Sequence, residues 1–194
     1  PHLPPEVVVA NHNGPRQTVV AGPTAAVDAL VAELTAKRYS ARRLPVAAAF
    51  HSPLVAGAAE VFADCLTEVD VARPQLPVWS NATAGLYGTE EADIRATLSD
   101  QLGRPVRFVD QVEAMYADGA RVFVEVGPGR VLTQLVGRIL GDRPHTAVAC
   151  DAPGDHGLTR LLTTLGTLAT AGVPVDVRAL FDGRAERVDL SALP

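Results

Sequence analysis

The sequence predicts an α/β fold with a parallel sheet, from three observations. Residues 122–126 read Val-Phe-Val-Glu-Val, which has too few polar positions for a half-exposed strand, so we expect them in the middle of a parallel sheet. A Gly-Pro-Gly turn at 127–129 then leads into apolar residues at helical spacing over 131–140. Residues 76–80 form another short strand-like run that follows a helical segment and precedes a second one.

The composition is that of an ordinary soluble protein of 194 residues, with 47% hydrophobic residues and a net charge of −5. This size suits one domain or two small subdomains. The absence of a basic tract argues against a nucleic-acid partner. No apolar run approaches the length of a membrane span and no charged-then-apolar leader opens the chain, so we expect no membrane partner and a cytoplasmic location. Neither cysteine has a second ligand at metal-binding spacing, so no metal site is predicted.

The first third of the chain predicts the element order β, β, α, β. Residues 6–10 and 17–21 are short β-type runs on either side of a segment rich in turn formers, which indicates a hairpin. Apolar residues at helical spacing after Pro23 predict a helix that ends near Lys37. Residues 41–46 then return as a strand.

His51 is the candidate general base. It ends an apolar run of strand character at 44–50, and Ser52-Pro53 opens a helix of about five turns, because serine caps a helix N-terminus and proline suits its first position. The partial positive charge at that terminus disfavours imidazolium, so we expect a neutral ring that can accept a proton. The alternative is a histidine packed in a strand-to-helix corner.

The second half continues the alternation of helices and strands. Thr89 is the expected cap of a helix that ends at Gly103, and a further helix over 108–116 precedes the strand at 122–126. The glycine-flanked turn at 127–129 matches neither the Walker nor the dinucleotide-binding pattern, so we interpret it as a tight connection rather than a phosphate site. Residues 146–150 predict one more strand, and a leucine stripe predicts a helix over 158–168.

Four motifs in series carry a family resemblance. They are His-Ser-Pro-Leu at 51–54, Pro-Val-Trp-Ser-Asn at 77–81, Gln-Leu-Gly-Arg-Pro-Val-Arg-Phe at 101–108 and Val-Glu-Val-Gly-Pro-Gly-Arg-Val-Leu at 124–132. In this order the chain resembles the second half of a malonyl-CoA:acyl-carrier-protein acyltransferase, as found in fatty-acid synthesis and in polyketide synthases. The likeness runs from about Val7 to Leu140.

The resemblance implies a division of the chain into three parts. Residues 1–46 would be part of a ferredoxin-like small subdomain, and residues 47–141 the C-terminal part of an α/β-hydrolase-like large subdomain. Residues 142–194 would be the segment that follows the acyltransferase in a multidomain polyketide synthase, and they are somewhat similar to the iterative enediyne type.

The resemblance also assigns roles to four residues. His51 would remove the proton of a serine nucleophile, and the main-chain carbonyl at Gln101 would hold the correct histidine tautomer. The loop with Asn11 and Asn13 would face the cleft, where one or the other would bind the acyl group. Asn81 follows the strand at 76–80, and because ligands gather at the carboxyl ends of strands in open α/β sheets, we expect it to help shape the cleft. Without the resemblance, Gln101 is equally an exposed residue at a helix end, and the asparagines are turn formers.

The nucleophile itself is not recognisable, because none of the five serines lies in a Gly-x-Ser-x-Gly context. The resemblance places the nucleophile, the oxyanion donors and the arginine for the malonyl carboxylate before residue 1, so we expect a fragment. Its expected partners are the N-terminal half of the same domain, malonyl-CoA as substrate, and an acyl carrier protein. We expect no cofactor apart from the phosphopantetheine of that carrier.

Phe50 bears on the acyl group. The stretch Ala-Ala-Phe-His at 48–51 is similar to the His-Ala-Phe-His of malonyl-selective domains, in which the ring fills the space that an α-methyl group would need, although Ala48 departs from that pattern. Two other functions stay open: a non-catalytic docking or scaffold module for a carrier protein, and a serine hydrolase of similar fold.

Overall fold

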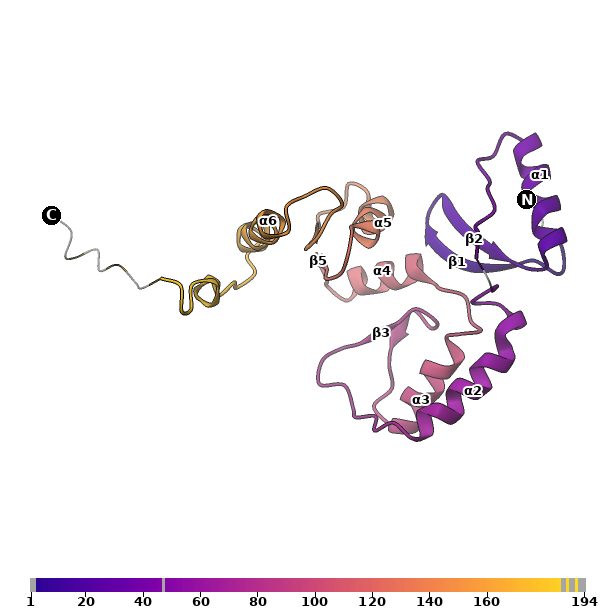
Figure 1. Ribbon diagram of the computed structural model, residues 1–194, viewed down its shortest axis with the longest axis horizontal. Coiled ribbons are helices and arrows are strands. Elements are labelled where there is room, and N and C mark those ends of the chain that lie inside the picture. Colours follow the sequence, from indigo (N-terminus) through magenta and orange to yellow (C-terminus); the bar gives the residue numbers. More distant parts are fainter. Residues whose placement is uncertain (1–2, 47, 186–187, 189–190, 192–194) are drawn as a thin grey trace. The chain divides into compact units, whose positions relative to one another are not determined.

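The computed structural model describes residues 3–46, 48–185, 188 and 191 (Figure 1). The chain forms two compact units. The first unit comprises residues 1–120 and 135–143, and the second comprises residues 121–134 and 144–194. Among the described residues, no helix is long and apolar enough to cross a membrane.

The first unit begins with the predicted hairpin, in which β1 (Val8–Gly14) pairs antiparallel with β2 (Gln17–Ala21). The sequence predicted that the asparagine-rich segment forms the turn, but residues 11–14 belong to β1. The register of β1 shifts between Val9 and Asn11 and again between His12 and Gly14. Such shifts are β-bulges, which let turn-forming residues stay within a strand. The helix α1 (Thr24–Ala36) follows and ends where the sequence predicts.

The prediction of a strand at 41–46 is wrong. Residues 41–46 and 48–50 form no strand, and Ala47 lies outside the described residues. A strand needs a neighbour for its backbone hydrogen bonds, and the described part of the chain offers this segment none. Leu44 and Val46, with exposures of 40% and 65%, consequently face solvent.

Two antiparallel helices follow and lie side by side (Figure 1). A 3-10 turn, η1 (Pro53–Val55), leads into the first of them, α2 (Ala56–Thr67). A hairpin of two short strands, β3 (Trp79–Ser80) and β4 (Gly85–Leu86), then precedes the second, α3 (Glu91–Asp100). Thr89 is not the cap of α3. Glu90 occupies that position without a side-chain cap bond.

The first unit closes with α4 (Phe108–Ala117) and most of α5 (Val131–Leu140). Arg143 ties them together, because its guanidinium makes two bonds of 2.7 and 2.6 Å to the Glu113 carboxylate and donates to the Leu140 and Ile139 carbonyls. The hydrogen bond from Arg143 lowers the pKa of Glu113. Val112 and Leu140, at 1% and 2% exposed, are core residues of this region.

The second unit contains the strands predicted at 122–126 and 146–150, and the structure pairs them in parallel. β5 (Val122–Glu125) and β6 (Thr146–Ala149) pair in parallel with Val122 opposite Thr146, and α6 (Gly157–Thr170) and the 3-10 turn η2 (Val177–Leu180) follow. α6 fixes the end of β6, since Thr164 donates to the Ala149 carbonyl. The leucine stripe of α6 is less buried than its periodicity predicts, with exposures of 36–49% for the leucines at 158, 161 and 162.

Candidate active site

His51 adopts a backbone conformation that is unusual for a residue with a side chain. Its φ is +60°, in the left-handed region, which costs about 1 kcal/mol or more. Three groups hold it there: the His51 N–H donates to the Leu102 carbonyl at 2.9 Å, and the ring faces two further carbonyls. The turn therefore aims the imidazole at the segment that follows α3.

Ser52 fixes the other side of this turn. The residue is 1% exposed, and its hydroxyl donates to the Ala49 carbonyl at 2.6 Å and accepts from the Leu54 N–H at 3.3 Å. Ser52 therefore caps only the 3-10 turn η1, which Pro53 opens, whereas the α-helix α2 begins later, with Val55 as its N-cap and no side-chain cap bond. The same bonds commit this hydroxyl to the backbone.

The orientation of the His51 ring is set by main-chain carbonyls. Nδ1 lies 3.0 Å from the carbonyl oxygen of Gln101 and 3.2 Å from that of Arg104. Carbonyl oxygens only accept, so Nδ1 carries a hydrogen and Nε2 of the neutral ring presents a lone pair. No hydrogen bond from the described residues occupies Nε2, and the residue is only part-buried.

Gln101 is the C-cap of α3, where helix carbonyls lack partners within the helix, and Arg104 lies in the segment that follows. The C-terminal end of a helix also carries partial negative charge. The sequence indicated only the positive end of the helix after His51. The structure adds the end of α3 on the other side of the ring.

Residues 104–107 connect the other predicted site residues to His51. The Val106 N–H donates to the Ala10 carbonyl at 2.8 Å, and Val106 forms an isolated parallel bridge with Asn11 on β1. The Arg107 N–H donates to the Asn81 carbonyl at 2.9 Å. Asn13 lies two residues further along the same strand as Asn11.

The sequence marked residues 101–108 as a family motif but assigned no role to residues 104–107. Their contacts use backbone groups, which every residue has, so the residue types alone could not predict them. Phe50, next to His51, is 56% exposed. A hollow of about 350 Å³ beside α3 is lined by Thr83, Asp93, Thr97 and Arg104 among others, and His51 does not line it.

The hydroxyls of three serines are engaged with the local backbone. Ser52 is described above, the buried Ser80 hydroxyl accepts from the Ala82 N–H, and Ser99 donates to the Ala96 carbonyl. No hydrogen bond joins a serine hydroxyl to the His51 ring within the described residues. Within the described residues, the contacts of the His51 ring are therefore those with the two carbonyls.

Carboxylates occupy the backbone donors around the Gly-Pro-Gly turn. Gly129, at φ +81°, donates its N–H to Asp151 at 2.9 Å. At the start of α5, the Glu125 carboxylate accepts from the Leu132 and Thr133 N–H groups and from the Thr133 hydroxyl, at 2.7–3.1 Å. A phosphate would need these same donors, so the turn acts as a tight connection.

The cap at Glu125 predicts a pH-dependent contribution to stability. Partial burial raises the pKa of Glu125, but the bonds from Thr133 and Leu132 together outweigh it and hold the pKa below its ordinary value of 4.5. The contribution is therefore present above that ordinary value and is lost as the pH falls through the lowered pKa. We expect Glu125→Gln to reduce the free energy of unfolding by about 1 kcal/mol at pH 7, measured by urea denaturation.

The deficit of Glu125→Gln should shrink as the pH is lowered from 7 toward 3, because the native glutamate takes up its proton as the pH falls through the lowered pKa. Glu60→Gln, at an exposed position on α2, is the matched control and should change little at either pH. A deficit of equal size at pH 7 and pH 3 would contradict the charge-based explanation.

Comparison with known proteins identifies the family. The sequence model of the acyl transferase domain matches residues 2–175. Polyketide synthase GfsA from Streptomyces halstedii is 37% identical over 187 residues, which are 95% of this chain and 2% of that protein. The malonyl CoA-acyl carrier protein transacylase of Bacillus subtilis (strain 168) is 38% identical over 135 residues, covering 69% of this chain and 42% of the relative.

Solved structures agree with the sequence comparison. The acyltransferase domain from the second module of the salinomycin polyketide synthase has a TM-score of 0.80 at 29% identity, covering 94% of this chain and 44% of that one. The chain belongs to the acyl transferase domain family. It spans less than half the length of these relatives. The predicted α/β class with a parallel sheet is confirmed.

Proposed function

We propose that this chain is the histidine-bearing C-terminal part of an acyltransferase that moves a malonyl group from coenzyme A to the thiol of an acyl carrier protein in polyketide biosynthesis. One observation carries the proposal: two main-chain carbonyls hold Nδ1 of His51 and leave Nε2 for proton transfer. The family membership and the name of the Bacillus relative support the acyl donor and acceptor.

In the proposed reaction, His51 moves a proton twice. A serine outside these residues attacks the malonyl thioester while Nε2 takes its proton, and the C–S bond breaks as that proton passes to the departing coenzyme A sulfur. The carrier thiol then attacks the seryl ester, Nε2 takes the thiol proton, and the serine oxygen receives it. The Gln101 and Arg104 carbonyls keep the hydrogen on Nδ1 throughout.

Four residues are proposed to bind the acyl group. Phe50 would line the space beside the α-carbon, and Asn11, Asn13 and Asn81 would contribute amide groups from the elements that residues 104–107 join. The proposed enzyme needs no cofactor of its own, because malonyl-CoA is its substrate and the phosphopantetheine belongs to the carrier protein.

The proposed structural partner of this chain is the N-terminal half of the same acyltransferase domain. Around β5 and the start of α5, apolar side chains stay exposed, with 41% at Val124, 83% at Val126 and 65% at Val131. Apolar surface next to the edge of a two-stranded parallel pair is typical of a sheet that continues. The solved relative is about twice as long as the matched part, which supplies enough polypeptide for such strands.

An assay of the intact polypeptide that contains this chain tests the function. It is incubated with malonyl-CoA and a phosphopantetheine-bearing carrier protein, and mass spectrometry follows malonyl on the enzyme and on the carrier. We expect malonyl first on the enzyme and then on the carrier. Carrier binding without malonylation would favour a scaffold module, and rapid release of free malonate with an unloaded carrier would favour a hydrolase.

A further inference from the structure

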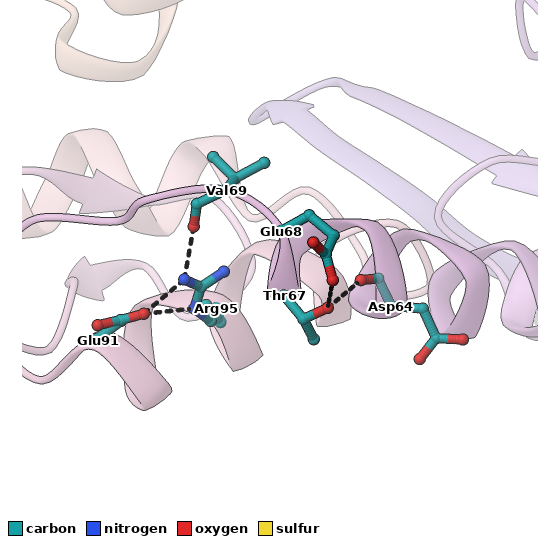
Figure 2. Close-up of polar contacts among 6 residues, drawn as sticks. All are labelled: Asp64, Thr67, Glu68, Val69, Glu91 and Arg95. Atoms are coloured by element: carbon teal, nitrogen blue, oxygen red, sulfur yellow. Dashed lines mark hydrogen bonds and ion pairs between the residues drawn. The ribbon is translucent and has the colours of Figure 1, made fainter.

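Arg95 links α3 to the end of α2 through a defined set of contacts (Figure 2). Its Nη2 donates to the Val69 carbonyl just beyond α2, and its Nε donates to the Glu91 carboxylate at 3.0 Å. Glu91 lies one turn earlier on α3 and also bonds Nη2. The Arg95 side chain is 20% exposed and that of Glu91 is 59% exposed, so the guanidinium is mostly buried while the carboxylate lies at the surface.

The two helices that Arg95 joins also carry the two halves of the His51 site. His51 lies before α2, and the Gln101 carbonyl lies at the end of α3. Because the helices run antiparallel, the Arg95–Val69 contact is at one end of the pair and the His51–Gln101 contact is at the other. Gln101 follows Arg95 by six positions, which is about 9 Å along a helix.

The chemistry of Arg95 suits a role in geometry better than one in stability. Its Nη1 is buried and has no hydrogen-bond partner among the described residues. A buried unpaired donor costs free energy, and an apolar side chain of similar volume would avoid that cost. A guanidinium held between a carboxylate and a helix-end carbonyl instead fixes distance and direction on both sides.

We propose that Arg95 is a positioning residue for acyl transfer: by bonding Val69 and Glu91 it sets the register of α2 against α3, and thereby the approach of His51 Nδ1 to the Gln101 carbonyl. This inference rests on the proposed role of His51. Small displacements of a base from its orienting group lower the chemical step far more than they lower substrate binding.

The test compares Arg95→Met with Arg95→Lys in the intact polypeptide. We expect Arg95→Met to lower kcat for malonyl transfer about tenfold, with less than a twofold change in KM for malonyl-CoA. NMR of the His51 ring nitrogens should show a mixture of tautomers in place of the Nδ1–H form. Arg95→Lys keeps a donor for Val69 and should recover kcat to within about threefold.

Arg143→Met is the matched control, since Arg143 likewise bonds a carboxylate and helix-end carbonyls, but between α4 and α5. It should leave kcat within twofold of wild type at a similar loss of Tm. A normal kcat in Arg95→Met, or an equal kcat loss in Arg143→Met, overturns the proposal. If Arg95→Met does not fold, Glu91→Gln takes its place in the test. We expect Glu91→Gln to lower kcat about threefold and to produce the same mixture of His51 tautomers. A normal kcat in Glu91→Gln would likewise overturn the proposal. Transfer that survives loss of the His51 ring would instead overturn the proposed function.

Discussion

Replacing His51 by alanine is expected to lower malonyl transfer to the carrier protein by about a thousandfold or more, because both half-reactions lose their proton acceptor. The ring is held by the Gln101 and Arg104 carbonyls, and Nε2 makes no hydrogen bond with the described residues. The measurement is the rate of carrier malonylation, together with the rate at which the enzyme itself is acylated. Both rates should fall together, while binding of the carrier should persist.

Two further variants sharpen the test of His51. His156→Ala, at an exposed position before α6, controls for loss of a histidine and should leave the rate within twofold. Gln101→Ala keeps the main-chain carbonyl that contacts His51 and should cost less than about threefold. A large loss in Gln101→Ala would mean that the side chain, which lies 3.5 Å from the Tyr87 hydroxyl, matters more than the carbonyl.

The parts of the fold that local patterns determine could be predicted from the sequence. Turn formers between two β-type runs predicted the β1–β2 hairpin, helical spacing predicted α1 and α2, and a run with one polar residue predicted that β5 belongs to a parallel sheet. The segment at 41–46 failed because strand formation depends on a partner as well as on local preference. α6 shows a related limit: a leucine stripe indicates which face is apolar, but nothing in the stripe determines what covers it.

The candidate site divides in the same way. His51 and its Ser52 cap left a local signal that a single sequence can reveal. The acceptor at Gln101 left none, because a main-chain carbonyl is common to all residues, and only the family resemblance marked its position. The same holds for residues 104–107, whose backbone bonds to Ala10, His12 and Asn81 join parts of the chain that are far apart in sequence.

Phe50→Ser should change the choice of acyl group in the intact polypeptide, with methylmalonyl-CoA gaining about ten- to a hundredfold relative to malonyl-CoA in kcat/KM. The ring precedes the base directly and is 56% exposed, so it is available to line the acyl site. A pocket wall that excludes one methyl group is worth about 1–3 kcal/mol of discrimination, and serine removes most of that wall.

The comparison that decides the role of Phe50 is a competition between the two coenzyme A esters, read as the ratio of acyl-enzymes formed. Phe50→Leu is the matched control, because it keeps an apolar side chain of intermediate size and should shift the ratio less than serine does. Phe62→Ser, on α2, tests whether loss of any nearby phenyl ring has the same effect, and it should leave the ratio unchanged. Equal use of both esters by the unaltered protein would show that Phe50 does not select against the α-methyl group. The proposed role of His51 would stand in that case, because proton transfer at the serine does not depend on the acyl substituent.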